Sequence, residues 1–598
     1  MDDFAPLSEG HENSGDPSRP NALARLHLLV QRALVYHALG RMAKRYGSVF
    51  SFWLGPQLAV YVSSYEAIKE VLVTKHKEFA SRPPLPERIS LTLHPKSIFA
   101  TRRLAILHLL STKAVKASVS IRFEETELLI EHLKRESEKN GGIIEPRDRI
   151  FRANLNTMMR PLFGVRFPAR DEPGFTDARE ALYQSLQRSF RQMGDFDWGT
   201  ILPVLSVFAN RDVRKTTSFR DGELLALIEE HRSARAKAGT DFVARDLVDT
   251  LLEIQEKEEL ENNDIIAILV DFLNACELAQ SLSALSRDCV LWQSARLTLY
   301  AAVDTSGVSI EWTLAELTRR PAMRRRVQEE IDAVVGRGRP VGEDDLQNLP
   351  YFLAEYSLVS VFFKGGLDLK RGTALGRGWP VGEEDLQDLP YLLASMNLTQ
   401  CSRMALDGPW CQSRRAVSGG ADVHRGRPVR VNELEDLPHF AAVIKEHFRY
   451  RSIGPFLGPH MNDRETTISG YRIPAQTLIV AHTRGLSRDS TVFERAEEFL
   501  PERFLTEDID ITGKDIRVAP FGAGRRGCPG ILQGLTVVQL AVARIAQTFD
   551  FELIDGEDID MTERDWGLQV SLRTPLKARF TVRRQEHENT DPARQHME

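Results

Sequence analysis

One cysteine stands in a glycine- and arginine-rich loop near the C-terminal end of this chain. Residues 520–530 read PFGAGRRGCPG, and a run with helical character follows from Leu532 to Phe549. No second cysteine lies nearby, so the Cys528 thiolate can bind a metal without forming a disulfide. Glycines let the backbone approach a flat cofactor and aim N–H groups at the sulfur, and the start of the next helix adds positive potential. These features meet the requirements of a thiolate ligand for haem iron.

The alternative is a glycine-rich turn around an inert buried cysteine, and a lone Cys-x-Gly would favour it. Here the whole pattern F-x-x-G-x-R-x-C-x-G is present, carried by Phe521, Gly524, Arg526, Cys528 and Gly530. These residues resemble the haem-binding signature of the cytochrome P-450 family of haem-thiolate monooxygenases. The resemblance implies haem b as the cofactor, with Cys528 as the axial ligand of its iron. Arg526 would pair with a haem propionate.

A charged triad is expected to hold this loop in place. Glu446 and Arg449 are three residues apart and therefore share one helix face. Such a pair alone carries little information, because solvated helices contain many of them. A Pro-Glu-Arg-Phe run at 501–504 follows, and then the cysteine loop, in an order that resembles the family's. By that resemblance Glu446, Arg449 and Arg503 form a buried charge and hydrogen-bond triad that locks the loop.

An acid–alcohol pair marks the helix expected on the other side of the haem. Residues 301–306 read AAVDTS and resemble the family's A-G-x-D-T-T/S, with Ala302 where the family has glycine. The resemblance implies that Asp304 relays protons and that Thr305 hydrogen-bonds dioxygen and water. The alternative is a polar pair in an ordinary helix.

Two further residues are candidates for haem contacts through the resemblance. His460 follows Gly458-Pro459, at a place where the family often has a propionate partner. The family's W-x-x-x-R element is damaged here, because Arg102 and Arg103 survive but no tryptophan precedes them. Arg103 is the remaining candidate for the arginine of that element.

The composition narrows the classes of protein. With 598 residues and 42% hydrophobic content, the chain can bury a large core. The net charge of −6 gives no bulk basic character, so no nucleic-acid partner is expected. An odd number of cysteines without C-x-x-C spacing argues against a disulfide framework and fits a reducing compartment. The five are Cys276, Cys289, Cys401, Cys411 and Cys528.

The hydrophobic patterns predict a mainly α protein with a minor β portion. This is the architecture of the cytochrome P-450 fold, here one large haem-binding domain over residues 23–583. Alternating residues at 48–63 predict a hairpin, and a second β region is expected at 465–482. Amphipathic periodicity predicts helices over Tyr65–Val73, Phe123–Lys139, Gly222–Ala238 and Leu299–Leu317.

Polar termini and two insertions are expected outside this core. Residues 1–22 and 584–598 are charged or polar and predict disorder. Residues 272–298 have no clean period and would stretch one helix to about 84 Å, so we interpret them as an insertion. Residues 336–354 match 376–394 at 15 of 19 positions, with a weaker third copy at 424–442, and residues 355–423 are therefore interpreted as a second insertion. Four of the five cysteines fall in these two segments.

The function implied by the resemblance is monooxygenation of a small hydrophobic organic substrate. One oxygen atom of O2 enters the substrate, with electrons from NADPH through NADPH–cytochrome P-450 reductase. The motifs FASRPP at 79–84 and GYRIPA at 470–475 are most like plant members of the microsomal class, which act at the cytosolic face of the endoplasmic reticulum membrane. No transmembrane segment is visible, so a soluble or peripherally associated chain is expected.

Two alternatives to the monooxygenase remain open. Relatives that rearrange peroxides or dehydrate their substrates need no reductase, and Asp304-Thr305 argues against that class. The stronger alternative is a catalytically defective haem-binding chain, motivated by the two insertions and the damaged element near residue 100.

Overall fold

The computed structural model describes most of the predicted domain. The described residues are 35–54, 57–81, 110–192, 226–238, 242, 246–257, 300–346, 437–458, 460–555, 557–564 and 569–583. The termini 1–22 and 584–598, the two interpreted insertions and Arg103 lie outside them.

Most of the described elements are helices. The longer ones are α2 (Val35–Tyr46), α6 (Val119–Lys139), α7 (Arg147–Phe163), α8 (Asp177–Gln192), α11 (Leu247–Lys257), α14 (Tyr300–Arg319), α15 (Pro321–Val334), α22 (Pro438–Tyr450) and α25 (Ile531–Thr548). The shorter ones are α3 (Tyr65–Lys69), η1 (Glu70–Thr74), α5 (Thr112–Ala117), α16 (Glu343–Leu346), α23 (Thr483–Ser487), α24 (Arg503–Thr506), η7 (Ile516–Val518) and η8 (Gly524–Arg526). Residues 226–238 are helical as well.

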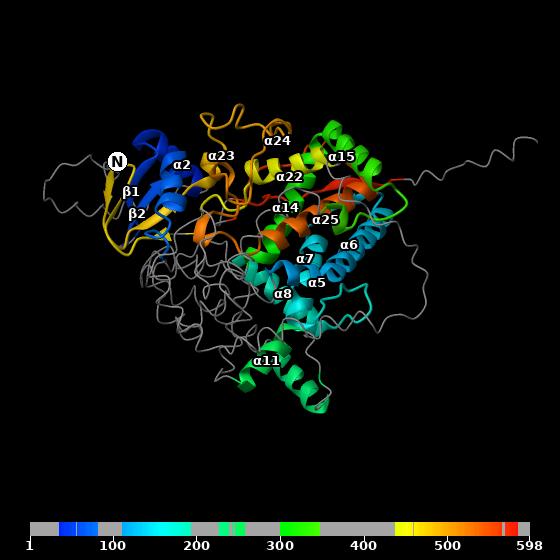
Figure 1. The fold of residues 1–598 in the computed structure, drawn as a ribbon. Coiled ribbons are helices and arrows are strands. Elements are labelled where there is room, and N and C mark those ends of the chain that lie inside the picture. The colour runs from blue at the N-terminus through cyan, green and yellow to red at the C-terminus, as the bar shows by residue number, and fades with distance from the viewer. Residues whose placement is uncertain are drawn as a thin grey trace, which may run out of the picture.

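The strands form three small sheets. The largest has the order β1-β2-β7-β4, from β1 (Val49–Leu54), β2 (Gln57–Val62), β7 (Leu478–Ala481) and β4 (His460–Met461). The other sheets are β3-β9-β8, from β3 (Ile143–Ile144), β9 (Ala578–Val582) and β8 (Phe549–Glu552), and the pair β5 (Thr466–Ile468) and β6 (Tyr471–Ile473). β2 pairs with β7 in parallel and with β1 in the antiparallel sense. Figure 1 shows the largest sheet at one end of the molecule and the helices gathered beside it.

The main core surrounds α14. This helix contacts α7, α22, α15 and α25, and it lies in the middle of the helical body (Figure 1). The side chain of Trp312 on α14 is fully buried and donates from Nε1 to the Val570 carbonyl at 3.0 Å. α25 is also buried along most of its length, with thirteen buried residues from Leu532 to Ala546. These two helices form the scaffold on which the candidate site is built.

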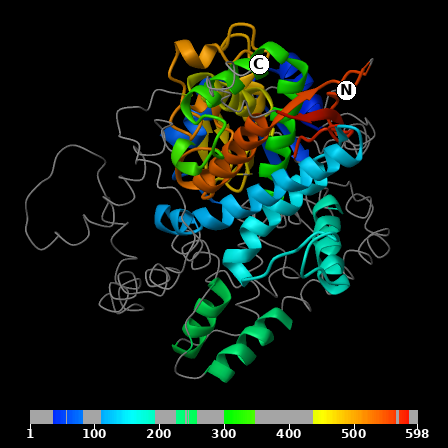
Figure 2. The same cartoon turned by 90° about the vertical axis from the view of Figure 1, so that its right-hand side faces the viewer.

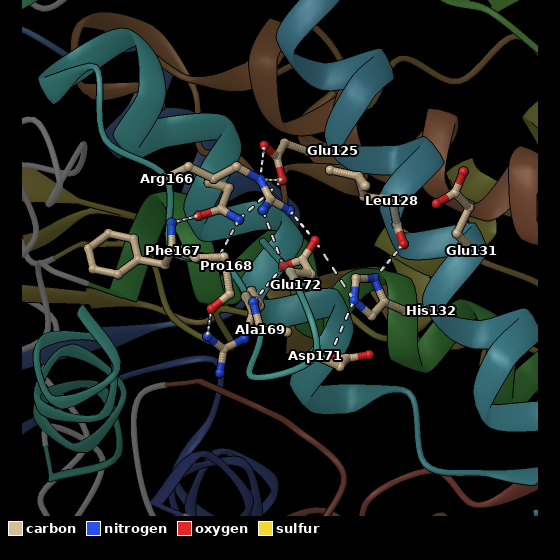
Figure 3. Close-up of polar contacts among 12 residues, drawn as sticks. Glu125, Leu128, Glu131, His132, Arg166, Phe167, Pro168, Ala169, Asp171 and Glu172 are labelled. Atoms are coloured by element: carbon tan, nitrogen blue, oxygen red, sulfur yellow. Dashed lines mark hydrogen bonds and ion pairs between the residues drawn. The ribbon is translucent and has the colours of Figure 1, made fainter. Parts of the chain in front are cut away.

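A polar network fixes the segment after α7 onto α6. The buried carboxylate of Glu125 accepts hydrogen bonds from Arg160 at 2.9 Å, Arg166 at 2.8 Å and Asn156 at 3.1 Å. Arg166 also donates to both carboxylate oxygens of Glu172, at 2.8 and 3.1 Å (Figure 3). Because a buried carboxylate must be paired, this network determines how the chain leaves α7.

The elements agree with the sequence predictions in type. The hairpin at 48–63 is β1 and β2, the helix expected at Leu299–Leu317 is α14, and the β region at 465–482 contains β5, β6 and β7. One prediction was incomplete, because the helix expected at Tyr65–Val73 changes to a π-turn at η1. There Lys75 N–H donates to the Glu70 carbonyl at 2.7 Å, five residues back, which is the wider π spacing.

Candidate functional site

Cys528 lies in a tight loop between η8 and α25. Its backbone N–H donates to the Phe521 carbonyl at 2.8 Å, which closes the loop on itself. The side chain is partly buried and carries a thiol. A Cβ added to Gly530 would lie 3.9 Å from the Cys528 sulfur, so the backbone at the start of α25 runs close beside the sulfur. The positive end of that helix is therefore near a group that binds metals as an anion.

Gly524 is required where it stands. Its φ is +66°, and a Cβ there would lie 2.6 Å from the Leu72 carbonyl oxygen of η1. Neither the left-handed conformation nor the close approach suits an L side chain. The π-turn of η1 and the cysteine loop are thus in backbone contact. The glycine at position 524 is therefore required by this backbone contact as well as by any ligand that the loop binds.

Arg526 and His460 belong to one neighbourhood. Arg526 Nε donates to the Ala80 carbonyl at 2.8 Å. The next residue, Ser81, accepts a hydrogen bond from Met461 N–H at 2.9 Å, and Met461 follows His460 on β4. The structure therefore places both predicted propionate partners around the Ala80–Ser81 segment. Arg103, the third candidate, lies outside the described residues.

The structure brings Glu446, Arg449 and Arg503 together. Arg449 donates from Nε and Nη2 to the two carboxylate oxygens of Glu446 at 2.6 and 2.8 Å, and both side chains are fully buried. Arg503 Nε lies 3.3 Å from the same carboxylate. The carboxylate also accepts from Leu500 N–H at 2.6 Å.

The remaining donors of Arg449 bind backbone carbonyls. Nη1 donates to Ser487 at 2.6 Å and Ala496 at 2.9 Å, and Nη2 donates to Glu498 at 2.8 Å. One side chain thereby fixes the segment from α23 to residue 498 against α22. Next to Arg449, the Phe448 ring lies 5.0 Å from the Phe521 ring at the start of the cysteine loop. The charged cluster and the loop are connected through this aromatic pair.

The acid–alcohol pair lies where α14 crosses the start of α25. Ser306 Oγ is 3.9 Å from the position of a Cβ on Gly534, and Gly534 is six residues after Cys528. On another side of the helix, a Cβ on Gly307 would lie 3.3 Å from Asn154 Nδ2 of α7. The two residues that follow the Asp304-Thr305 pair therefore pack against α25 and α7.

Desolvation raises the pKa of the Asp304 carboxyl from 3.8 to about 6. Arg147 on α7 and the nearby amide of Gln569 act in the opposite direction and lower it. A carboxyl with a pKa close to neutrality can both hold and release a proton under working conditions. Sequence reasoning missed Arg147 and Gln569, because each lies more than 150 positions from Asp304 and neither belongs to a short motif.

The donor set fits a haem with a thiolate ligand. It offers one thiol at the start of a helix, glycines that remove side chains from the loop, and a partly buried arginine and a buried histidine in the same neighbourhood. The cytochrome P450 family model matches residues 17–277, 279–354 and 421–582, which is most of the chain. The chain belongs to the cytochrome P450 family. Between residues 17 and 582 the match omits residue 278 and residues 355–420, and it includes the rest of the segment 272–298.

Several P450 enzymes are similar over nearly their whole length. Cytochrome P450 CYP736A12 of Panax ginseng is 28% identical over 580 residues, covering 94% of this chain and 92% of that protein. Trans-cinnamate 4-monooxygenase of Sorghum bicolor is 26% identical over 553 residues, covering 89% and 85%. The structure of a zebra fish cytochrome P450 with abiraterone has a TM-score of 0.58 at 21% identity, covering 92% of this chain and 99% of that one.

These findings confirm the expected family, fold and cofactor. The chain is a cytochrome P450 similar to plant enzymes, an oxidoreductase of the monooxygenase class, with a mainly α fold and haem held by a cysteine thiolate. In the signature of this P450, Cys528 is the cysteine that the motif predicts as the haem ligand. When bound, the haem supplies the redox chemistry that activates dioxygen.

We expect Gly524→Ala to lower the haem content of this P450. The substitution adds left-handed strain of about 1–2 kcal/mol and also forces the loop away from Leu72. The matched control is Gly174→Ala, because Gly174 has φ +80° but no atom within 4 Å of its added Cβ. Haem absorbance per mole of protein measures the effect, and equal haem content in the two variants would contradict it.

Glu446→Gln should lower the free energy of unfolding by about 3–5 kcal/mol, because the buried Arg449 guanidinium then lacks its charged partner. Urea denaturation of the haem-loaded protein measures this change. Glu498→Gln is the control, since its side chain pairs with Arg495 at the surface and its loss should leave stability nearly unchanged. An equal decrease in the free energy of unfolding in both variants would contradict the prediction that the buried pair stabilises the fold more than a surface pair does.

Proposed function

We propose that this P450 takes electrons from NADPH through NADPH–cytochrome P450 reductase and inserts one oxygen atom of O2 into a small hydrophobic substrate. The observation that carries the proposal is the crossing of α14 and α25 next to Cys528. This crossing puts the Asp304-Thr305 pair on the helix that adjoins the thiolate loop. Oxygen activation needs an acid–alcohol pair on the side of the haem opposite the thiolate, whereas a peroxide rearrangement needs neither group.

In this proposal each side chain has a defined task. Cys528 ligates the iron, and Arg526 and His460 bind the propionates from the Ala80–Ser81 side. Asp304 holds a proton on its carboxyl and delivers it, while Thr305 orients dioxygen and water by hydrogen bonding. Glu446, Arg449 and Arg503 act through the loop rather than on the substrate.

The comparison with plant enzymes supports a class of substrate. One similar protein is named a trans-cinnamate 4-monooxygenase, so we take small aromatic acids and phenylpropanoids as the first class to test. Terpenoids and fatty acids are the other classes that an apolar cavity would accept.

The plant microsomal relatives support association with the endoplasmic reticulum membrane, on its cytosolic face. Within the described residues, α25 alone is long and apolar enough to span a bilayer, and 72% of it is buried inside the protein. This burial is typical of a core helix.

Reconstitution tests the proposed reaction. The haem-loaded chain, plant reductase and NADPH are incubated under 18O2 with a panel that begins with trans-cinnamate, and we expect product carrying one labelled oxygen. Thr305→Ala should consume NADPH and O2 but form less product per O2, whereas Cys528→Ser should lose the thiolate band of the reduced carbon monoxide complex. Unchanged coupling in Thr305→Ala would refute the role of Thr305. A wild-type thiolate band without any reductase-dependent turnover would refute the proposed reaction.

The pH dependence tests Asp304 separately. Because this carboxyl must be protonated to deliver a proton, and its pKa is about 6, turnover should fall as the pH rises through about 6. In Asp304→Asn the rate should be lower by about 10²-fold or more, and this inflection should be absent. An Asp304→Asn profile that keeps the inflection would assign it to another group. Substrate binding, followed by the optical spectrum, serves as the control for an intact pocket.

A further inference from the structure

His231 joins three helical elements, namely residues 226–238, α7 and α11. It lies in the helical segment 226–238, and its Nδ1 is 2.7 Å from Asp249 Oδ1 of α11. Its Nε2 is 3.1 Å from the carbonyl oxygen of Phe163, the last residue of α7, and 3.7 Å from Asp246 Oδ2. Asp246 and Asp249 are buried, and the imidazole is largely buried between them.

Both ring nitrogens of His231 face groups that only accept hydrogen bonds. An ionised carboxylate and a backbone carbonyl have no proton to offer, so each nitrogen must donate. A neutral imidazole carries only one N–H. Its other nitrogen would then face an oxygen atom with a lone pair on each side, which is repulsive. With the Asp249 carboxylate ionised, the doubly protonated imidazolium satisfies both contacts. Its positive charge also suits the C-terminal end of α7, where the carbonyl of Phe163 lies.

We propose that His231, as an imidazolium, is a pH-sensitive clamp that holds residues 226–238 against α11 and the end of α7. The charged groups that face the ring are Asp246 and Asp249, while on its own helix Arg232 pairs with Glu229 at 2.5 Å. Arg232 also donates to Gln255 of α11 at 2.7 Å, so a second contact, which does not titrate, joins the same two helices. Figures 1 and 2 show α11 and its neighbouring helix together at the edge of the molecule.

The clamp is connected to the wall of the candidate site through an apolar cluster. Ile228 of the clamped helix and Val248 and Leu251 of α11 belong to the same buried cluster as Val303 of α14. Val303 directly precedes Asp304. Loss of the clamp would therefore loosen the helical layer that packs behind the acid–alcohol pair. This inference is independent of the reaction proposed above, because it concerns packing and can be measured without turnover.

The direction of the pH effect follows from the contacts. Burial lowers the pKa of His231, but the hydrogen bond to Asp249 and the two carboxylates outweigh it, and the net pKa lies above the ordinary 6.5. A raised pKa in the folded protein means that the proton stabilises it. That stabilisation is complete below the unfolded pKa of 6.5 and is lost as the pH rises through the folded pKa. Between the two values the equilibrium for local opening rises about tenfold per pH unit.

Hydrogen exchange read by mass spectrometry tests the clamp on the haem-loaded full chain. Exchange of peptides covering 226–238 and 246–257 is measured from about pH 6 to about pH 9 and corrected for the intrinsic pH dependence of exchange. We expect opening to increase with pH and then level off in the wild type. In His231→Gln opening should be high and independent of pH, while His439→Gln, on α22, should behave as the wild type in these peptides.

Asp249→Asn keeps the test decisive if His231→Gln does not fold. The amide keeps the shape and the accepting oxygen but removes the charge, so the levelling-off point should move to lower pH. Corrected exchange that does not change with pH in the wild type would overturn the proposal, as would an unmoved levelling-off point in Asp249→Asn. Zn2+ that protects these peptides in the wild type but not in His231→Gln would also overturn it, since His231, Asp246 and Asp249 would then be metal ligands.

Discussion

The contact between Glu446 and Arg449 is the constraint on which the proximal half of this P450 depends. Two fully buried charges must satisfy each other. Three further hydrogen bonds of the guanidinium, and one that the carboxylate accepts, then hold the backbone segments from α23 to Leu500. These segments have little secondary structure of their own. The ion pair therefore holds these segments in place where no sheet or helix does so. Its neighbour Phe448 packs against Phe521 and so links the pair to the cysteine loop.

The two sides of the site are ordered by different physics. On the cysteine side, hydrogen bonds and close glycine contacts leave little freedom for the backbone, which suits a ligand whose geometry must not change. On the Asp304 side, the helix α14 passes through an apolar layer, and desolvation alters the acidity of one carboxyl. Rigid positioning and tuned acidity are thus supplied by separate elements, which meet where α14 crosses α25 and where it packs on α22.

Motifs of a few consecutive residues were enough to predict the candidate site residues and the elements that carry them. The cysteine loop, the E-x-x-R helix and the Asp304-Thr305 pair are each contained in a few consecutive residues, and the elements that carry them were predicted in type and nearly in extent. The contact of Arg526 with Ala80 could not be predicted, because it joins residues 446 positions apart. The π-turn of η1, which lies against Gly524, could not be predicted either. The charged groups around Asp304 and His231 were also beyond prediction, because they depend on how helices distant in the sequence pack.

The parallel pairing of β2 with β7 has a consequence for the synthesis of this protein. β7 begins 416 residues after β2 ends, so the hairpin β1-β2 leaves the ribosome long before the strand that covers its edge. At about 5–20 residues per second, the delay is roughly 20–80 seconds. During this time the edge of β2 that later pairs with β7, which includes Val60 and Val62, is open to pairing with other chains. The nascent N-terminal hairpin is thus a natural client for chaperones.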